Sequence, residues 1–167
     1  MKFQRFLIGG VLLAALGTGL VPAPLPAPAL ARENRPLKCN IGAARKDPPH
    51  GGPALVANMP RAMTPVDLNA VQMNDRETWK KVVVEGLFAR RTEANTLEVT
   101  ARLVNCTKQP LVVQARSSFL DASQAPAEKA SVWKPVYLSP LSTSVYQERS
   151  ISPDGVEFYL IELRADQ

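Results

Sequence analysis

Residues 97–105 read LEVTARLVN, and this stretch decides the fold class. Leu97, Val99, Ala101 and Leu103 are apolar, and the residues between them, Glu98, Thr100 and Arg102, are polar. Side chains of a strand point alternately to its two faces, so this period of two predicts a strand with one buried and one solvent-exposed face.

The same alternation continues on both sides of that stretch. The extended segments are KKVVVEGLFARRT (80–92), LVVQARSSFL (111–120), VWKPVYL (132–138), STSVYQERSI (142–151) and VEFYLIELR (156–164). Gly86 marks the expected place of a bulge, and Pro135 favours an edge or a bend. With a further strand expected over 68–73, about seven short strands and no long amphipathic helix predict an all-β antiparallel sandwich.

The N-terminus has the three regions of a secretory signal peptide. Lys2 and Arg5 precede an apolar run that ends near Val21, and a Pro/Ala tail closes with Ala-Leu-Ala at residues 29–31. The glycines and Pro22 keep the run below the roughly 20 residues that a membrane span needs. We therefore expect residues 1–31 to be a cleaved signal peptide and the protein to be periplasmic.

The next segment, residues 32–61, is dense in proline and glycine and holds no apolar period. Such a stretch buries too little surface to offset its ordering entropy, so we expect a flexible arm. The folded domain is then expected over 62–167. The single histidine, His50, lies within PPHGGP and is expected to be an exposed loop residue.

The two cysteines are Cys39 and Cys106. Cys39 lies well past the apolar run and follows bulky, charged Lys38, unlike a lipoprotein cysteine, so we do not expect a lipid anchor. One histidine and two cysteines cannot supply a structural zinc site, and a CxxC redox pair is absent. An intramolecular disulfide is the favoured reading for an exported chain, against free thiols or an intermolecular bridge. It would staple the arm to the domain.

Charge and motifs bear on function mainly by exclusion. The net charge of +5 falls to +3 without residues 1–31, which remove two basic residues and no acid. Basic residues are spread along the chain, which disfavours nucleic-acid binding but leaves room for peripheral contact with membranes or envelope polymers. No nucleotide-binding motif, catalytic histidine arrangement or metal-ligand cluster is visible, so no enzyme activity and no cofactor are expected.

The aromatic residues Trp133, Tyr137 and Tyr146 are the candidate binding residues. Trp133 and Tyr137 lie in a short segment beside Pro135, where an exposed ring could anchor a partner. For Trp133 the favoured alternative is a core position between two sheets, as in many sandwiches.

The run from residue 97 to residue 150 resembles the YcfL-like family of small bacterial envelope proteins, and the resemblance extends over residues 66–164. Its landmarks are an Asn-x-Thr turn, a Phe/Leu-Asp strand end, a Trp, a Leu-x-Pro and a later Tyr. In this sequence they are Asn105, Thr107, Phe119, Asp121, Trp133, Leu138, Pro140 and Tyr146. The resemblance implies an immunoglobulin-like sandwich without catalytic residues. Cys106, inside the Asn-x-Thr turn, fits the disulfide.

Two functions follow as expectations. The first is a non-catalytic module that contacts other cell-envelope proteins, for example as an accessory subunit of a larger assembly, with exposed sheet edges available for strand addition. The second is a periplasmic carbohydrate- or lipid-binding module that stacks its ligand on Trp133, Tyr137 and Tyr146.

Overall fold

The computed structural model describes residues 39, 41–46 and 49–166. The expected signal peptide, residues 1–31, lies outside the described residues. Among those described, no helix is both long and apolar enough to cross a membrane.

The stretch LEVTARLVN forms the inner strand β5 (Leu97–Asn105) of a four-stranded sheet. It pairs antiparallel with β4 on one side and β8 on the other, and β2 adds to the far side of β4. The bounds of these neighbours are Thr64–Val66 for β2, Val82–Arg91 for β4 and Thr143–Arg149 for β8.

The second sheet is built around β6 (Leu111–Leu120) and β9 (Phe158–Ala165). Strand β7 (Lys134–Leu138) pairs with the free side of β6 and forms one edge of this sheet. The short strands β1 (Ala54–Leu55) and β3 (Val71–Met73) pair with the other side of β9. The β3–β9 pair is parallel, whereas the others are antiparallel.

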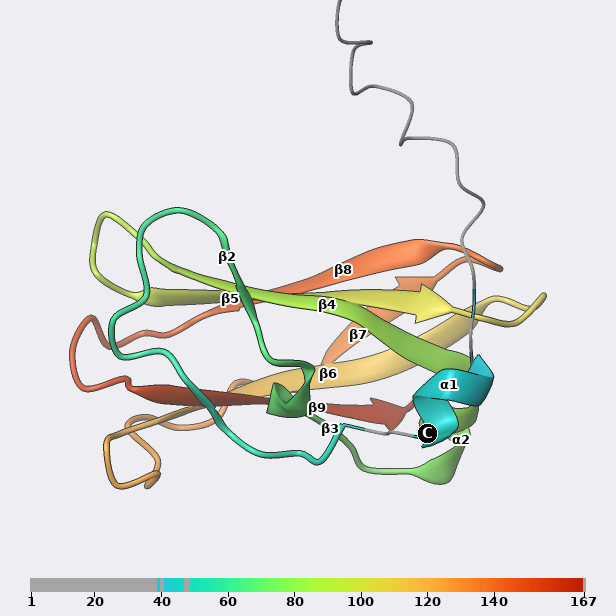
Figure 1. The fold of residues 1–167 in the computed structure, drawn as a ribbon, viewed down its shortest axis with the longest axis horizontal. Coiled ribbons are helices and arrows are strands. Elements are labelled where there is room, and N and C mark those ends of the chain that lie inside the picture. The colour runs from blue at the N-terminus through green and yellow to red at the C-terminus, as the bar shows by residue number, and fades with distance from the viewer. Residues whose placement is uncertain (1–38, 40, 47–48, 167) are drawn as a thin grey trace, which may run out of the picture. The chain divides into compact units, whose positions relative to one another are not determined.

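The two sheets lie one over the other as two layers (Figure 1). Their inward side chains form one apolar core, to which β5 contributes four positions and β9 contributes Tyr159, Ile161 and Leu163. The alternation seen in the sequence therefore has its expected cause, burial of every second side chain. The predicted all-β sandwich is confirmed.

The bulge expected at Gly86 is confirmed, because the register between β4 and β5 shifts between Val84 and Gly86. A Cβ atom on Gly86 would lie 2.9 Å from the ring of Phe88. The glycine therefore lets the Phe88 ring fold back over the strand.

The prediction of one strand over 68–73 is wrong in its first half. Residues Leu68–Ala70 form a short 3-10 helix, η2, and only Val71–Met73 are extended. The carboxylate of Asp67 accepts from the N–H of Asn69 at 2.9 Å and caps this turn. This local hydrogen bond competes with strand formation.

A second helix, α2 (Arg76–Lys81), was not predicted. Asp75 caps it, since its carboxylate accepts from the Thr78 N–H at 2.7 Å and the Thr78 hydroxyl at 2.8 Å. The Asp75 carboxylate also accepts from the N–H of Ala165 at 2.6 Å, which fixes α2 against the end of β9. The start of α2 is therefore determined by this cap, and the helix has no apolar periodicity that would reveal it in the sequence.

Part of the segment expected as a flexible arm, residues 32–61, has regular secondary structure. Residues 54–55 form β1 on β9, and Val56 is buried in the core. Ile41–Lys46 form a short helix, α1, which lies beside α2 (Figure 1). The folded sandwich therefore begins before residue 62, since β1 pairs with β9 and Val56 packs in the core.

Cys39 and Cys106 form a disulfide with their Cα atoms 5.3 Å apart. The bond joins the segment before α1 to the turn that follows β5. The predicted pairing is confirmed.

Candidate functional site

The three predicted aromatic residues do not share a face. Tyr146 points into the core, where its hydroxyl lies 3.1 Å from the hydroxyl of Ser117. Burial raises the pKa of Tyr146, and the hydrogen bond with Ser117 opposes part of that rise. Tyr137 is 72% exposed on β7, so it faces solvent. A stacking row of Trp133, Tyr137 and Tyr146 is therefore ruled out by the burial of Tyr146.

Trp133 is not a core residue between the sheets, and that expectation is wrong. Two guanidinium groups lie over its ring, with Arg164 4.1 Å and Arg116 4.6 Å from the ring centroid. Both arginines alternate with core residues of β9 and β6, so the stack lies on the outer face of their sheet. The pairing is a cation–π contact, strongest over the face of a Trp ring.

Strand β8 is the free edge of its sheet in the described part of the chain. The Asn105 N–H donates to the Ser142 carbonyl at 3.0 Å, and the Ser150 N–H donates to the Leu97 carbonyl at 2.8 Å. Opposed residues of an antiparallel pair alternate between bonded and non-bonded pairs. These two bonds place the even-numbered residues of this segment in bonded pairs with β5. The N–H and C=O groups of Thr143, Val145 and Gln147 therefore point away from β5.

The neighbouring edge, strand β7, is blunted by contrast. Its Pro135 has no N–H to offer, and the carbonyl of Tyr137 accepts from the Ser144 hydroxyl at 2.8 Å. Proline on an edge strand prevents another strand from pairing there. Of the two edges on this side of the sandwich, β8 is the one with backbone groups available.

Exposed apolar side chains gather in the same part of the chain. Five of the eight large apolar residues that are exposed in the described structure fall between residues 132 and 151. They are Val132, Tyr137, Leu141, Val145 and Ile151. We define the β8 edge surface as these five residues together with Thr143 and Gln147.

An ion cluster around the buried carboxylate of Glu98 lies beside this surface. Glu98 on β5 is only 1% exposed, and its carboxylate binds Arg90 of β4 at 2.6 Å and Arg149 of β8 at 3.0 Å. The hydrogen bond from Arg90 lowers the pKa of Glu98 most, burial opposes it, and Arg149 lowers the pKa further. The cluster links the three neighbouring strands β4, β5 and β8.

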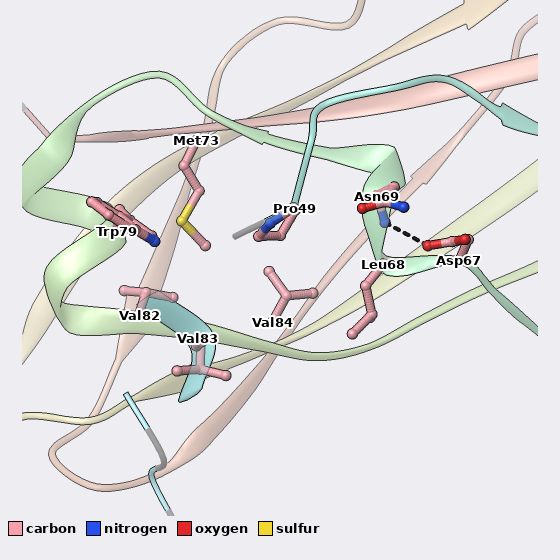
Figure 2. A pocket seen from close by; sticks show the side chains of 10 residues that line it. Pro49, Asp67, Leu68, Asn69, Met73, Trp79, Val82, Val83 and Val84 are labelled. Atoms are coloured by element: carbon pink, nitrogen blue, oxygen red, sulfur yellow. Dashed lines mark hydrogen bonds between the residues drawn. The ribbon is translucent and has the colours of Figure 1, made fainter. Parts of the chain in front are cut away.

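A separate pocket of about 460 Å³ lies at the other side of the sheet, between η2, α2 and the start of β4 (Figure 2). We call it the Trp79 pocket. Figure 2 shows Trp79 and Met73 near one end, Leu68 and Asp67 at the other, and Pro49 and Val84 between them. Its lining residues are Ala44, Pro49, Asp67, Leu68, Asn69, Met73, Trp79, Val82, Val83 and Val84.

The indole nitrogen of Trp79 is buried and has no hydrogen-bond partner among the described residues. In Figure 2 this nitrogen lies on the side of the ring that faces into the pocket. A second hollow of about 590 Å³, the polar hollow, shares Pro49, Met73 and Trp79 with the pocket. Its remaining lining residues are His50, Gly51, Gln72, Asn74, Asp75 and Arg76.

Sequence reasoning missed Trp79, because its neighbours Glu77 and Lys80 are polar and give no sign of a pocket. His50, expected in an exposed loop, is exposed and lines the polar hollow. Among the described residues, no three His, Cys, Asp or Glu side chains come together as a metal site would require.

Comparisons with known proteins found solved structures with a similar fold but no match in sequence. No protein-family model matches the chain, and no curated protein matches it. The chain is similar to the crystal structure of Cj0090 from Campylobacter jejuni, with 12% identity, a TM-score of 0.47, and coverage of 59% of this chain and 99% of that one. It is also similar to a DUF1425 family member from Shewanella sp. PV-4, with 17% identity, a TM-score of 0.47, and coverage of 70% and 98%.

Proposed function

We propose that the protein is a non-catalytic, exported module that binds other cell-envelope proteins. In this proposal, the open edge of β8 accepts an extended segment of the partner as an additional strand. The observation that carries the proposal is the row of outward backbone groups at Thr143, Val145 and Gln147. Main-chain hydrogen bonds supply affinity in strand addition, and exposed side chains beside the edge supply specificity.

Several features support an extended polypeptide as the partner. Val145 is 56% exposed at the middle of the edge, and exposed Tyr137 and Leu141 lie close to it in the chain. Aromatic and apolar anchors near the centre of an interface carry much of its binding energy. The adjoining ion cluster at Glu98 holds β8 in place before binding, which reduces the ordering cost.

Export is part of the same proposal. The charged start, apolar run and Ala-Leu-Ala end of residues 1–31 support a periplasmic location. The disulfide between Cys39 and Cys106 supports an oxidising compartment, where such bonds persist.

We also propose that the chain is a YcfL-like protein with an immunoglobulin-like sandwich. In support, the landmark residues hold the fold together. Asn105 accepts from the N–H and hydroxyl of Thr107, at 2.8 Å each. Asp121 accepts from the N–H groups of Ser123 and Ala125 at 2.8 and 3.0 Å and closes the turn after β6.

The test is photocrosslinking in cells from a photoreactive residue placed at Gln147, followed by mass spectrometry. A matched probe at exposed Glu93, in the turn between β4 and β5, reports background. We expect an envelope protein captured from Gln147 and not from Glu93.

Substitution at Val145 then separates backbone pairing from side-chain contact. Val145→Pro removes the outward N–H without breaking a bond to β5, whereas Val145→Ala keeps it. We expect the crosslink to be lost in the proline variant and to be weaker but still present in the alanine variant. Equal crosslinks in both variants, with both folded by circular dichroism, would rule out strand addition.

A further inference from the structure

The Trp79 pocket combines an apolar wall with one buried donor. Val82, Val84, Leu68 and Met73 supply the wall, and Met73 is flexible enough to adapt to the shape of a ligand. Buried Trp N–H groups normally find an acceptor, and that of Trp79 has none among the described residues. Pockets of this size and lining, with few polar groups, are typical of small-molecule sites.

The polar hollow next to it is lined by one arginine, Arg76, and one carboxylate, Asp75. Arg76 is exposed and makes no ion pair with the described residues. Asp75 also lines this hollow, but both of its oxygens are engaged by Thr78 and Ala165. The N–H groups of the Arg76 guanidinium are therefore available to an acceptor such as a ligand carboxylate.

We propose that this site binds a single-chain amphiphile with an anionic head. The unbranched alkyl chain occupies the Trp79 pocket, and a carboxylate oxygen of the head accepts from the indole N–H and lies toward Arg76. Trp79 lines both hollows, so its side chain lies where the apolar and polar parts meet. An unbranched chain suits walls made of valine, leucine and methionine side chains better than a flat polar ring would.

Dodecanoate, below its micelle threshold, is the probe. In a Trp133→Phe background of the mature chain, Trp79 is the single tryptophan, so its fluorescence reports on the pocket alone. We expect a saturable change in intensity and wavelength with dodecanoate, and a smaller change with dodecyltrimethylammonium. No saturable change with dodecanoate would overturn the proposal.

Calorimetric titration of variants assigns the contacts. Trp79→Phe removes the donor and Arg76→Ala removes the charge, and each is expected to weaken dodecanoate binding roughly three- to tenfold. Arg76→Ala is not expected to weaken binding of the cationic amphiphile.

Leu68→Asp places a carboxylate at the mouth of the pocket, where Leu68 is 41% exposed, and about a tenfold loss is expected. The matched control is Leu141→Asp, which makes the same change at an exposed leucine on the β8 edge surface. If Leu68→Asp and Leu141→Asp bind dodecanoate equally well, the amphiphile coats the surface and the proposal is wrong.

Discussion

The side-chain amide of Asn105, at the end of β5, donates to the carbonyl of Leu138, at the end of β7, at 3.1 Å. This buried hydrogen bond joins the two sheets of the sandwich. The same amide donates to the carbonyl of Gln109 at 2.7 Å, and its oxygen accepts from Thr107. One side chain therefore closes the turn that holds Cys106 and ties it to the opposite sheet.

Asn105→Ala is expected to lower the free energy of unfolding by about 2–3 kcal/mol, because buried carbonyl groups lose their donor. Urea denaturation measures this. Exposed Asn74 makes one side-chain hydrogen bond, to Glu162, so Asn74→Ala is the control and is expected to cost less than about 1 kcal/mol. Equal losses for the two variants would contradict the role given to Asn105.

Reduction of the Cys39–Cys106 disulfide is expected to lower the free energy of unfolding by about 2–4 kcal/mol. The cysteines are 67 residues apart, and a crosslink over such a loop restricts the unfolded chain strongly. Denaturant curves of the mature protein with and without reductant give the difference, with the double variant Cys39→Ser, Cys106→Ser as control. An unchanged denaturation midpoint, both in the reduced protein and in the double variant, would show that the disulfide does not stabilise the fold.

Glu98→Gln is expected to flatten the acid dependence of stability. The pKa of Glu98 lies below its ordinary value of 4.5 in the folded protein, so its contribution is present above that value and is lost as pH falls through the folded pKa. Thermal melts between pH 7 and pH 3 measure the slope. The variant is expected to be less stable at pH 7 and to lose less on acidification, and parallel curves would contradict this.

Tyr159→Phe is expected to leave stability unchanged or to raise it by about 1 kcal/mol, because the buried hydroxyl has no partner among the described residues. Burial also raises the pKa of Tyr159. The unfolded chain therefore ionises first, and stability falls as pH rises past 10, the ordinary pKa of tyrosine. Denaturation curves at pH 8 and pH 10.5 should show a smaller alkaline loss in the variant, and a larger loss would refute the assignment.

The sandwich could be predicted from the sequence, because a strand that buries one face has apolar residues at every second position. The alternation from Leu97 onward, the bulge at Gly86 and the edge position of Pro135 were all predicted. Two of the elements that it missed, η2 and α2, depend on an aspartate cap. Asp67 and Asp75 each cap one short turn, and a turn of that length has no period to detect.

The site was less accessible to sequence reasoning. Trp133 is held by Arg116 and Arg164, which come from different strands and meet only through sheet register. Trp79 faces a pocket whose walls come from η2, α2 and β4, so no local motif marks it. Such contacts between distant segments can be read only from the folded chain.

The central claim is that β8 presents an open edge on which a partner adds a strand. Backbone amide exchange along residues 143–148, followed by NMR, tests it most directly. In the free protein the amides of Val145 and Gln147 should exchange fast and that of Tyr146 slowly, and addition of the crosslinked partner should slow Val145 and Gln147 alone. Slow exchange at Val145 and Gln147 in the free protein, or no change when the partner binds, would contradict the account.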